Sequence, residues 1–255
     1  MKTDGRAPQR SVLVTGASRG IGAATAILCA RSGLAVAVNY THDDAAAQRV
    51  VAEIRACGGT ALALRADVAD SAQVNAMFER TDAELPALGG LVNNAGVIDV
   101  PSRVDAMSAQ RLQRMFTINV FGSFYCAREA VRRLSTANGG PGGAIVNLSS
   151  AAARLGAPGQ YVDYAAAKGA IDAFTIGLAR EVAAEGIRVN AVRPGIIDTD
   201  IHASGGQPDR ARQVAPQVPM QRAGRADEVA QAIVWLLSDS ASYTTGTILD
   251  VSGGR

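Results

Sequence analysis

A tyrosine and a lysine that could carry out acid–base chemistry stand four residues apart, at Tyr164 and Lys168. Both lie at the start of an Ala-rich segment of helical composition, so their side chains should share one face of a helix. A phenol with a pKa near ~10 is a poor acid–base group at neutral pH. A neighbouring ammonium favours the phenolate and should lower that pKa, so that Tyr164 could exchange a proton with a carbonyl or an alcohol.

Hydroxyl groups lie just upstream of this pair. An apolar run ends in Asn147-Leu148-Ser149-Ser150 and has the composition of a buried strand. The carboxyl ends of strands in parallel sheets face the ligand crevice, so hydroxyl, phenol and ammonium should meet there. Tyr161 is a second candidate phenol, but the residue four positions on is Ala165, so no lysine would share its face. We therefore expect Tyr161 to line the mouth of the substrate site.

A glycine-rich turn, Thr15-Gly-Ala-Ser-Arg-Gly-Ile-Gly22, follows the first apolar run and leads into a helical segment. A helix N-terminus offers unpaired N–H groups and a positive dipole to a pyrophosphate, and glycines let the backbone approach it closely. A mononucleotide P-loop would need Gly-Lys-Ser/Thr, which is absent. The turn therefore predicts a dinucleotide site. The residues expected to contact the cofactor here are Gly16, Ser18, Arg19, Gly20, Ile21 and Gly22.

The end of the second apolar run bears on the choice of dinucleotide. An acidic residue there would bond the adenosine ribose and repel a 2′-phosphate, but the run Val36–His42 contains none. Arg19 could pair with that phosphate. We favour NADP(H), and NAD(H) stays open as the alternative because Asp43 or Asp44 could reach the ribose. The residues expected to line this pocket are Asn39, Tyr40, Thr41 and His42.

Alternating segments must hold these residues in place. Seven apolar runs have the composition of buried strands: Ser11–Val14, Leu34–Asn39, Ala61–Arg65, Gly90–Asn93, Ala144–Ser149, Ile187–Val192 and Thr247–Val251. Helical segments lie between them and open with capping residues: Asp43 before 44–56, Asp70 before 71–84, Ser108 before 109–134 and Asp227 before 228–237. This order predicts an α/β Rossmann fold with a doubly wound, seven-stranded parallel sheet flanked by helices.

One domain is expected to span residues 1–255. The Gly-rich segment 138–143 is too short to join independent domains, and no internal repeat is evident. Residues 198–224 are rich in Gly, Pro and Gln and break the alternation, which predicts a lid over the substrate.

Composition excludes several kinds of function. The 255 residues are 48% hydrophobic, and a net charge of +2 without a basic cluster predicts neither a nucleic-acid nor a membrane partner. Two histidines and three scattered cysteines supply no metal site and make a Ser-His-Asp hydrolase a poor candidate. The segment Met1–Arg10 lacks the apolar centre of a signal peptide. We expect a cytoplasmic protein with reduced thiols.

Together these motifs resemble those of the short-chain dehydrogenases/reductases. The resemblance extends from Val12 to Gly254 and rests on ordered motifs: Thr15-Gly16-x-x-x-Gly20-x-Gly22, Asp67-Val68, Asn93-Asn94-Ala95-Gly96, Asn119, Ser150, Tyr164-x-x-x-Lys168, and Pro194-Gly195 with Thr199. It implies an oxidoreductase that moves hydride between a nicotinamide cofactor and a small-molecule carbonyl or secondary alcohol. It also implies a homo-dimer or homo-tetramer formed through the late helices and the C-terminal strand.

The resemblance implies a role for each matching residue. Tyr164 would donate or accept the proton, while Lys168 would hold the nicotinamide ribose and lower the pKa of the phenol. Ser150 would bond the substrate oxygen, and Asn119 would hold a water that links Lys168 to a proton relay. The remaining cofactor contacts would be Asp67 and Val68 at the adenine, Asn94, Ala95 and Gly96 at the adenosine ribose, and Pro194, Gly195, Ile197 and Thr199 at the nicotinamide.

One spacing departs from the pattern of the family. Its serine commonly precedes the tyrosine by about a dozen residues, whereas here the distance is 164 − 150 = 14. We interpret this as one extra residue in the loop before Tyr164. Ser150 then stays the catalytic hydroxyl, with Ser149 as the alternative.

These motifs are compatible with more than one function. Within the family, the sequence is similar both to sugar or polyol dehydrogenases of the glucose dehydrogenase kind, which would use NAD, and to 3-oxoacyl-carrier-protein reductases. The lid segment 201–210 is polar and has no row of basic residues for an acidic carrier protein, which favours a small free substrate. Arg154 and Asp163 could select a polar substrate or could be ordinary solvated loop residues. A non-enzymatic NADP(H) sensor is the alternative of another class, although a sensor would not need Tyr164, Lys168, Ser150 and Asn119 together.

Overall fold

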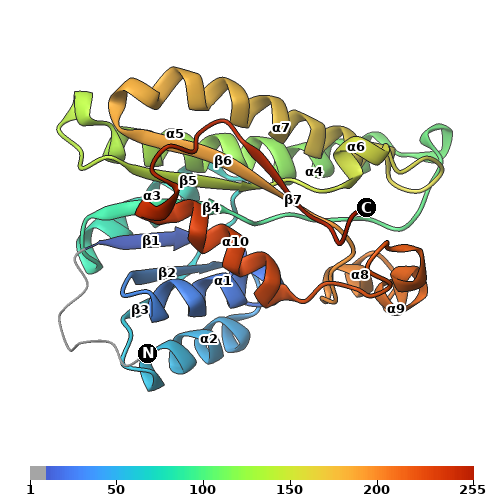
Figure 1. Cartoon of the computed structure of the whole chain (residues 1–255), viewed down its shortest axis with the longest axis horizontal. Helices are drawn as coiled ribbons and strands as arrows, with labels where there is room; N and C mark the ends of the chain where they lie inside the picture. The colour runs from blue at the N-terminus through green and yellow to red at the C-terminus, as the bar shows by residue number, and fades with distance from the viewer. Residues whose placement is uncertain (1–9) are drawn as a thin grey trace.

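A sheet of seven parallel strands forms the centre of the molecule (Figure 1). The computed structural model describes residues 10–255, so the prediction on the N-terminal segment falls almost wholly outside the described residues. The strand order is β3-β2-β1-β4-β5-β6-β7, which confirms the predicted doubly wound sheet. The strands are β1 Ser11–Val14, β2 Ala35–Tyr40, β3 Ala61–Arg65, β4 Leu88–Asn93, β5 Gly143–Leu148, β6 Ile187–Pro194 and β7 Ile248–Val251.

The order of the strands sets the position of the site. From β1 the chain adds β2 and β3 on one side, then returns to add β4 to β7 on the other. The crevice of a doubly wound sheet opens at the carboxyl ends of the two strands that flank this reversal. Here these strands are β1 and β4, so the glycine turn after β1 and the Asn-Asn-Ala-Gly segment after β4 lie side by side.

Alternate side chains of the strands face opposite layers of helices. Val12 and Val14 of β1 pack into the layer that contains α1, α2 and α10. Leu13 points to the opposite face, where α3, α5 and α7 cover the sheet (Figure 1). The central strands of the sheet are buried on both faces. Their sequences are therefore continuous apolar runs rather than alternations of apolar and polar residues.

Helices connect the strands, and several begin at capping residues that the sequence predicted. The carboxylate of Asp43 accepts from the Ala46 N–H, and that of Asp70 accepts from the Ala72 N–H. The prediction that Asp227 caps a helix starting at residue 228 is wrong. Helix α10 begins two residues earlier, at Ala226, and the Glu228 carboxylate accepts from the Arg225 N–H. The longer helices are α1 Gly20–Arg31, α2 Asp44–Ala56, α3 Ser71–Glu84, α4 Ala109–Phe116, α5 Gly122–Leu134, α7 Val162–Val182 and α10 Ala226–Leu237.

The predicted single helix over 109–134 is wrong in one respect. A π-helical turn, η2 (Thr117–Phe121), separates α4 from α5 without interrupting the helical path. No apolar spacing signals such a turn, because it depends on what the surrounding structure packs against it. It carries Asn119, whose side chain is fully buried.

Short helices make up much of the predicted lid. The segment 198–224 contains α8 Ile201–Ser204, α9 Arg210–Val214 and the 3-10 turn η5 Ala215–Gln217, and α8 and α9 lie together beside the carboxyl-terminal end of the chain (Figure 1). A Cβ at Gly205 would lie 3.1 Å from Ile98, so this segment packs closely on the loop after β4. The other short elements are η1 Val104–Ala106, η3 Thr136–Asn138, α6 Ala152–Leu155, η4 Ala183–Glu185 and η6 Asp239–Ala241. Within residues 10–255 no helix is long and apolar enough to cross a membrane.

Candidate active site and dinucleotide cleft

The glycine turn leaves room for a ligand at the start of α1. Gly16 has a φ of +61°, and a Cβ at Gly22 would lie 2.4 Å from the Gly16 carbonyl oxygen, so both positions require glycine. The N-cap residue Arg19 makes no side-chain cap, and the first turn of α1 holds no acidic residue. These first-turn N–H groups therefore suit an anionic pyrophosphate, and the residues present fit a dinucleotide.

Two asparagines hold this turn in shape. Asn39 at the end of β2 accepts from the Gly16 N–H at 3.1 Å and donates to the carbonyl of Ala66 at 3.0 Å. Its side chain is 1% exposed, so Asn39 supports the turn from inside rather than lining the cofactor pocket. The amide of Asn94 donates to the carbonyls of Thr15 at 2.8 Å and Gly16 at 3.0 Å. The Asn-Asn-Ala-Gly segment is thus bonded directly to the glycine turn.

The two carboxylates that follow β2 are exposed, but each is engaged in a hydrogen bond within the protein. Asp43 caps α2, and Asp44 accepts a 2.5 Å hydrogen bond from the hydroxyl of Tyr40, which raises the pKa of Tyr40. A guanidinium that the sequence reading missed lies here instead: Arg65, at the end of β3, donates through Nε to the carbonyl of Thr41 at 3.2 Å. The pairing of β2 with β3 brings these two segments together, which spacing along the chain could not show.

Arg19 extends from the glycine turn toward the lid. Its Nη2 lies 3.4 Å from the hydroxyl of Ser204 in α8. Thr199, at the start of the lid, lies at the same turn, because a Cβ at Gly20 would be 3.4 Å from its methyl carbon. The lid therefore closes over the glycine turn as well as over the loop after β4.

The adenine-side residues predicted from the resemblance lie after β3. Asp67 accepts from the Ala69 N–H at 2.9 Å and is half-buried. Val68 is buried, and a Cβ at Gly122 of α5 would lie 2.8 Å from its side chain. Gly122 therefore lets α5 approach this segment closely.

The structure brings Tyr164, Ser150 and Lys168 together at the carboxyl end of β5. Ser150 lies near enough to the Tyr164 hydroxyl to lower the pKa of the phenol, and Lys168 Nζ lies 5.6 Å from the centre of the Tyr164 ring. The ammonium is almost fully buried and donates to the carbonyl of Leu148 at 2.7 Å. Ser149 points elsewhere, with its hydroxyl donating to the backbone carbonyl of Lys168 at 3.3 Å. Of the two serines, Ser150 is the one that reaches the phenol.

Burial acts on both titratable groups of this trio. It lowers the pKa of Lys168 to about 8, against a smaller raising effect of Asp172. Burial also raises the pKa of Tyr164 to about 12, although Ser150 acts in the opposite direction. The expectation that Lys168 brings the phenol toward neutral pH is therefore not met. Desolvation of the phenolate is the main influence on this pKa, and the Lys168 ammonium donates to the Leu148 carbonyl.

Asn119 and Lys168 flank the backbone of Gly96. The amide nitrogen of Asn119 donates to the carbonyls of Val97 and Met115, both at 3.0 Å, and its oxygen accepts from the Val97 N–H. A Cβ at Gly96 would lie 2.7 Å from that oxygen and 3.6 Å from Lys168 Nζ. The three residues thus form one packed unit at the end of β4.

The segment after β6 borders the same space. The carbonyl of Pro194 accepts from the Ala151 N–H at 3.0 Å, next to Ser150. A Cβ at Gly195 would lie 2.8 Å from Ser252 Cα, so this close approach requires glycine. Ile197 is buried, and its carbonyl lies 3.0 Å from His202 Nε2 of α8. The residues predicted for the nicotinamide thus join the reacting groups to the lid.

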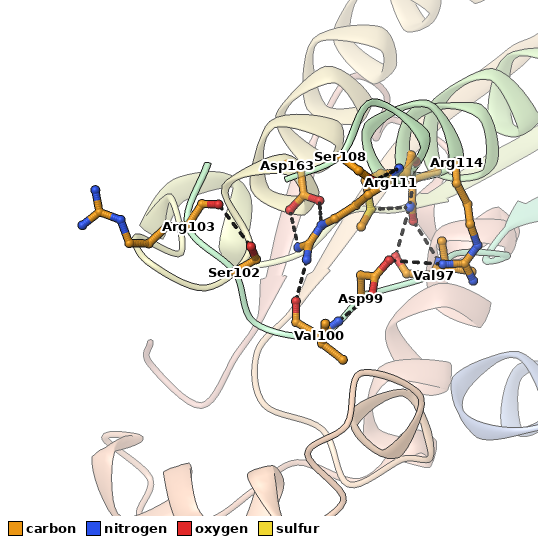
Figure 2. Close-up of polar contacts among 11 residues, drawn as sticks. Val97, Asp99, Val100, Ser102, Arg103, Ser108, Arg111, Arg114 and Asp163 are labelled. Atoms are coloured by element: carbon orange, nitrogen blue, oxygen red, sulfur yellow. Dashed lines mark hydrogen bonds and ion pairs between the residues drawn. The ribbon is translucent and has the colours of Figure 1, made fainter. Parts of the chain in front are cut away.

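Two residues considered for substrate selection are engaged elsewhere. Arg154 pairs with Asp250 of β7 at 2.9 Å. Asp163 is buried and paired with Arg111, a residue that the sequence reading did not single out (Figure 2). Tyr161, expected at the substrate mouth, is 3% exposed and donates to Gln207 of the lid at 2.8 Å.

Among residues 10–255 no cluster of His, Cys, Asp and Glu is placed to hold a metal ion. The cysteines at 29, 57 and 126 are all free thiols, and burial raises the pKa of Cys29 and of Cys126 to about 12.

Comparisons with known proteins agree with this arrangement of a Rossmann sheet, a glycine turn and a Tyr-Lys-Ser trio. The model of a family described as enoyl-(acyl carrier protein) reductase matches residues 16–255. The oxidoreductase YgfF of Escherichia coli (strain K12) is 57% identical over 243 residues, which cover 95% of this chain and 98% of YgfF. The 3-oxoacyl-[acyl-carrier-protein] reductase FabG of Staphylococcus aureus is 38% identical, covering 96% of this chain and 97% of FabG.

A solved structure has the same fold over nearly the whole length. The short-chain type dehydrogenase/reductase of Mycobacterium marinum superposes with a TM-score of 0.91 at 34% identity, covering 98% of this chain and 96% of that one. Fold and site together define an oxidoreductase that interconverts an alcohol and a carbonyl group. The chain belongs to the short-chain dehydrogenase/reductase family.

Proposed function

We propose that this protein is an NADP(H)-dependent carbonyl reductase in which Tyr164 gives a proton to the substrate oxygen. The observation that carries the proposal is that Tyr164 and Ser150 lie together beside the buried ammonium of Lys168 at the carboxyl end of β5. Because burial raises the pKa of Tyr164 to about 12, its phenol is protonated at neutral pH. A protonated phenol is suited to reduction, in which the substrate oxygen gains a proton.

Each residue has a part in this reaction. A bound nicotinamide would supply the hydride that reduces the carbonyl carbon. Ser150 holds the substrate oxygen next to Tyr164 Oη, and Tyr164 donates its proton as the C=O group becomes CH–OH. Lys168 lies near enough to stabilise the phenolate left on Tyr164, and a cation fixed in a buried site stabilises such a charge more strongly than it would in water.

Two arginines support NADP(H) over NAD(H). Arg65 lies at the end of β2 through its bond to the Thr41 carbonyl, and Arg19 lies in the glycine turn. Both carboxylates that could bind an unphosphorylated ribose, Asp43 and Asp44, have partners inside the protein. A 2′-phosphate would thus find guanidinium groups nearby, while both carboxylates are already engaged within the protein.

For the substrate we propose a small free carbonyl compound, with a 3-oxoacyl thioester of a carrier protein as the second candidate. The lid arginines support the first: Arg212 pairs with Asp209 at 2.8 Å, and Arg210 bonds Gln160 and Gln207. Arg210 bonds neutral amides and keeps its charge, so of these two arginines one is left without a carboxylate partner, which is no row of cations for an acidic carrier protein. The similarity to FabG supports the second candidate.

The test begins with fluorescence titration of the protein with NADPH and NADH in parallel. Tighter binding of NADPH that is lost in Arg19→Ala or Arg65→Ala is expected, and tighter NADH binding would overturn the cofactor assignment. A panel of ketones, aldehydes, sugars and 3-oxoacyl thioesters then measures turnover. Tyr164→Phe should bind NADPH normally and reduce nothing. Binding without turnover across the panel would favour a sensor instead of an enzyme.

We also propose a homo-oligomer, dimer or tetramer. Trp235 on α10 is 42% exposed, and Tyr243, just before β7, is fully exposed. Aromatic side chains such as these are enriched at contacts between subunits. Light scattering should give a mass above that of one chain, and a monomer would refute the proposal.

A further inference from the structure

A buried ion pair lies next to the reacting tyrosine, outside the Tyr-Lys-Ser trio. Arg111 Nε lies 2.7 Å from Asp163 Oδ2, and Nη2 lies 3.2 Å from Oδ1, so the guanidinium grips the carboxylate with two hydrogen bonds (Figure 2). The side chains are 9% and 0% exposed. Asp163 directly precedes Tyr164 in the first turn of α7.

The same guanidinium also holds the loop after β4. Its Nη1 donates to the carbonyl of Val100 at 2.7 Å, while the hydroxyl of Ser108 caps the helix at the Arg111 N–H (Figure 2). One side chain therefore joins three segments: α4, the first turn of α7 and the loop after β4. We call residues 97–102 of that loop the substrate-side segment.

Three further contacts fix the substrate-side segment. Asn119 bonds both the N–H and the carbonyl of Val97. Arg114 pairs with Asp99 at 3.5 Å, and the Ser102 N–H donates to the carbonyl of Gln160 at 2.9 Å. The substrate-side segment is thus bonded at its start to Asn119, at Val100 to Arg111, and at its end to the loop before Tyr164.

Stability alone does not account for a buried pair in this place. Replacing a buried ion pair by apolar side chains is often neutral or stabilising, because the removal of two charges from water is costly. What such a pair adds is geometry, since a bidentate guanidinium fixes both distance and orientation. Here the ion pair fixes the distance and orientation of Asp163, the residue before Tyr164, relative to the substrate-side segment.

We propose that Arg111 and Asp163 are a positioning pair, which holds the hydroxyl of Tyr164 at a fixed place against the substrate-side segment. This inference rests on the proposed function. Neither residue contacts the reacting atoms. Each acts through the start of α7 and through Val100, so loss of the pair displaces the phenol relative to the substrate and leaves the dinucleotide cleft unchanged.

The test compares an apolar double variant, Arg111→Met with Asp163→Leu, with the wild type. NADPH binding should stay within about twofold, because the cleft is built from other elements. The kcat for carbonyl reduction should fall at least ~10-fold, since small displacements of a reacting group cost up to about a hundredfold. The deuterium isotope effect with 4-deuterated NADPH should rise, because hydride transfer becomes more rate-limiting. A pair that only stabilises the fold would give a double variant with the wild-type kcat and isotope effect.

A second variant covers the case in which the double variant does not fold. Arg111→Lys keeps a buried cation beside Asp163 but loses the two-point grip, so it should fold, bind NADPH and show the same changes in kcat and isotope effect at smaller size. The control is Arg103→Met, which removes a fully solvated pair with Asp105. Unchanged kcat in Arg111→Lys would overturn the positioning role alone. A wild type that binds NADPH but reduces no carbonyl would overturn the proposed function, and the inference with it.

Discussion

Removal of the reacting lysine should make the protein more stable at neutral pH. Burial lowers the pKa of Lys168 from 10.5 to about 8, a depression of about 2.5 units, which corresponds to about 3 kcal/mol of destabilisation of the charged form. In Lys168→Met this cost disappears, while the lost hydrogen bond to the Leu148 carbonyl costs about 1 kcal/mol. Asp172 keeps its 2.7 Å partner Arg193. The net expectation is a gain of about 2 kcal/mol, with loss of turnover.

The gain should depend on pH with a definite sign. Below pH 8 the Lys168 amine is charged in both the folded and the unfolded states, so the buried charge lowers the unfolding free energy of the wild type by the full amount. As pH rises from about 8 toward 10.5, the folded state gives up its proton before the unfolded state does, and the wild type gains stability relative to the variant. The advantage of Lys168→Met should therefore be largest near pH 7 and shrink steadily above pH 8.

Two assays follow this reasoning. Urea denaturation at pH 7 and at pH 9.5 gives the difference in unfolding free energy, and melting curves at pH 7 should differ by roughly 4–8 °C. NMR of ¹³Cε-labelled lysine reads the pKa directly, because Lys2 is the only other lysine in the sequence. A Lys168 signal that titrates near its ordinary value, or a variant that is no more stable than wild type at pH 7, would refute the reasoning.

Three substitutions test other parts of the site. Gly22→Ala places a Cβ 2.4 Å from the Gly16 carbonyl, so it should abolish NADPH binding and cost about 1–3 kcal/mol of stability, measured by titration and by melting curves. Ser150→Ala should lower kcat by roughly 10²-fold in steady-state assays, whereas Ser149→Ala should lower it far less; the reverse order would reassign the hydroxyl. Arg65→Ala should weaken NADPH binding and leave NADH binding unchanged, and equal losses for both cofactors would exclude a role in phosphate recognition.

Local patterns predicted much of the fold. The buried strands read as Val- and Ile-rich runs because both faces of the sheet are covered, and the caps Asp43 and Asp70 lie where helices begin. The glycine turn was also predictable, since Gly16 and Gly22 occupy positions that admit no side chain. Each of these features leaves a mark in a short stretch of sequence: an apolar run, a capping side chain or a pair of glycines.

Features that depend on tertiary contacts were not predictable. Arg111 and Asp163 are 52 residues apart, and nothing local marks either as paired. Asn39 was expected in the cofactor pocket but is enclosed by the Ala66 carbonyl and the glycine turn, which a strand sequence does not encode. The pKa of Tyr164 was predicted in the wrong direction because the motif names its neighbour Lys168 but not the extent of burial.

The π turn at Thr117–Phe121 gives the helical path one residue more than a regular helix would need. Such a turn closes after one more residue than an α-helical turn, so deletion of one residue from it would leave an ordinary helix in which Arg111 and Met115 keep nearly their present faces. The residue most affected would be Asn119, which lies in the turn itself. A deletion inside α4 or α5 would instead rotate the residues before it by about 100° around the helix axis relative to those after it. Related chains should therefore lose a residue at 117–121 more readily than elsewhere in 109–134.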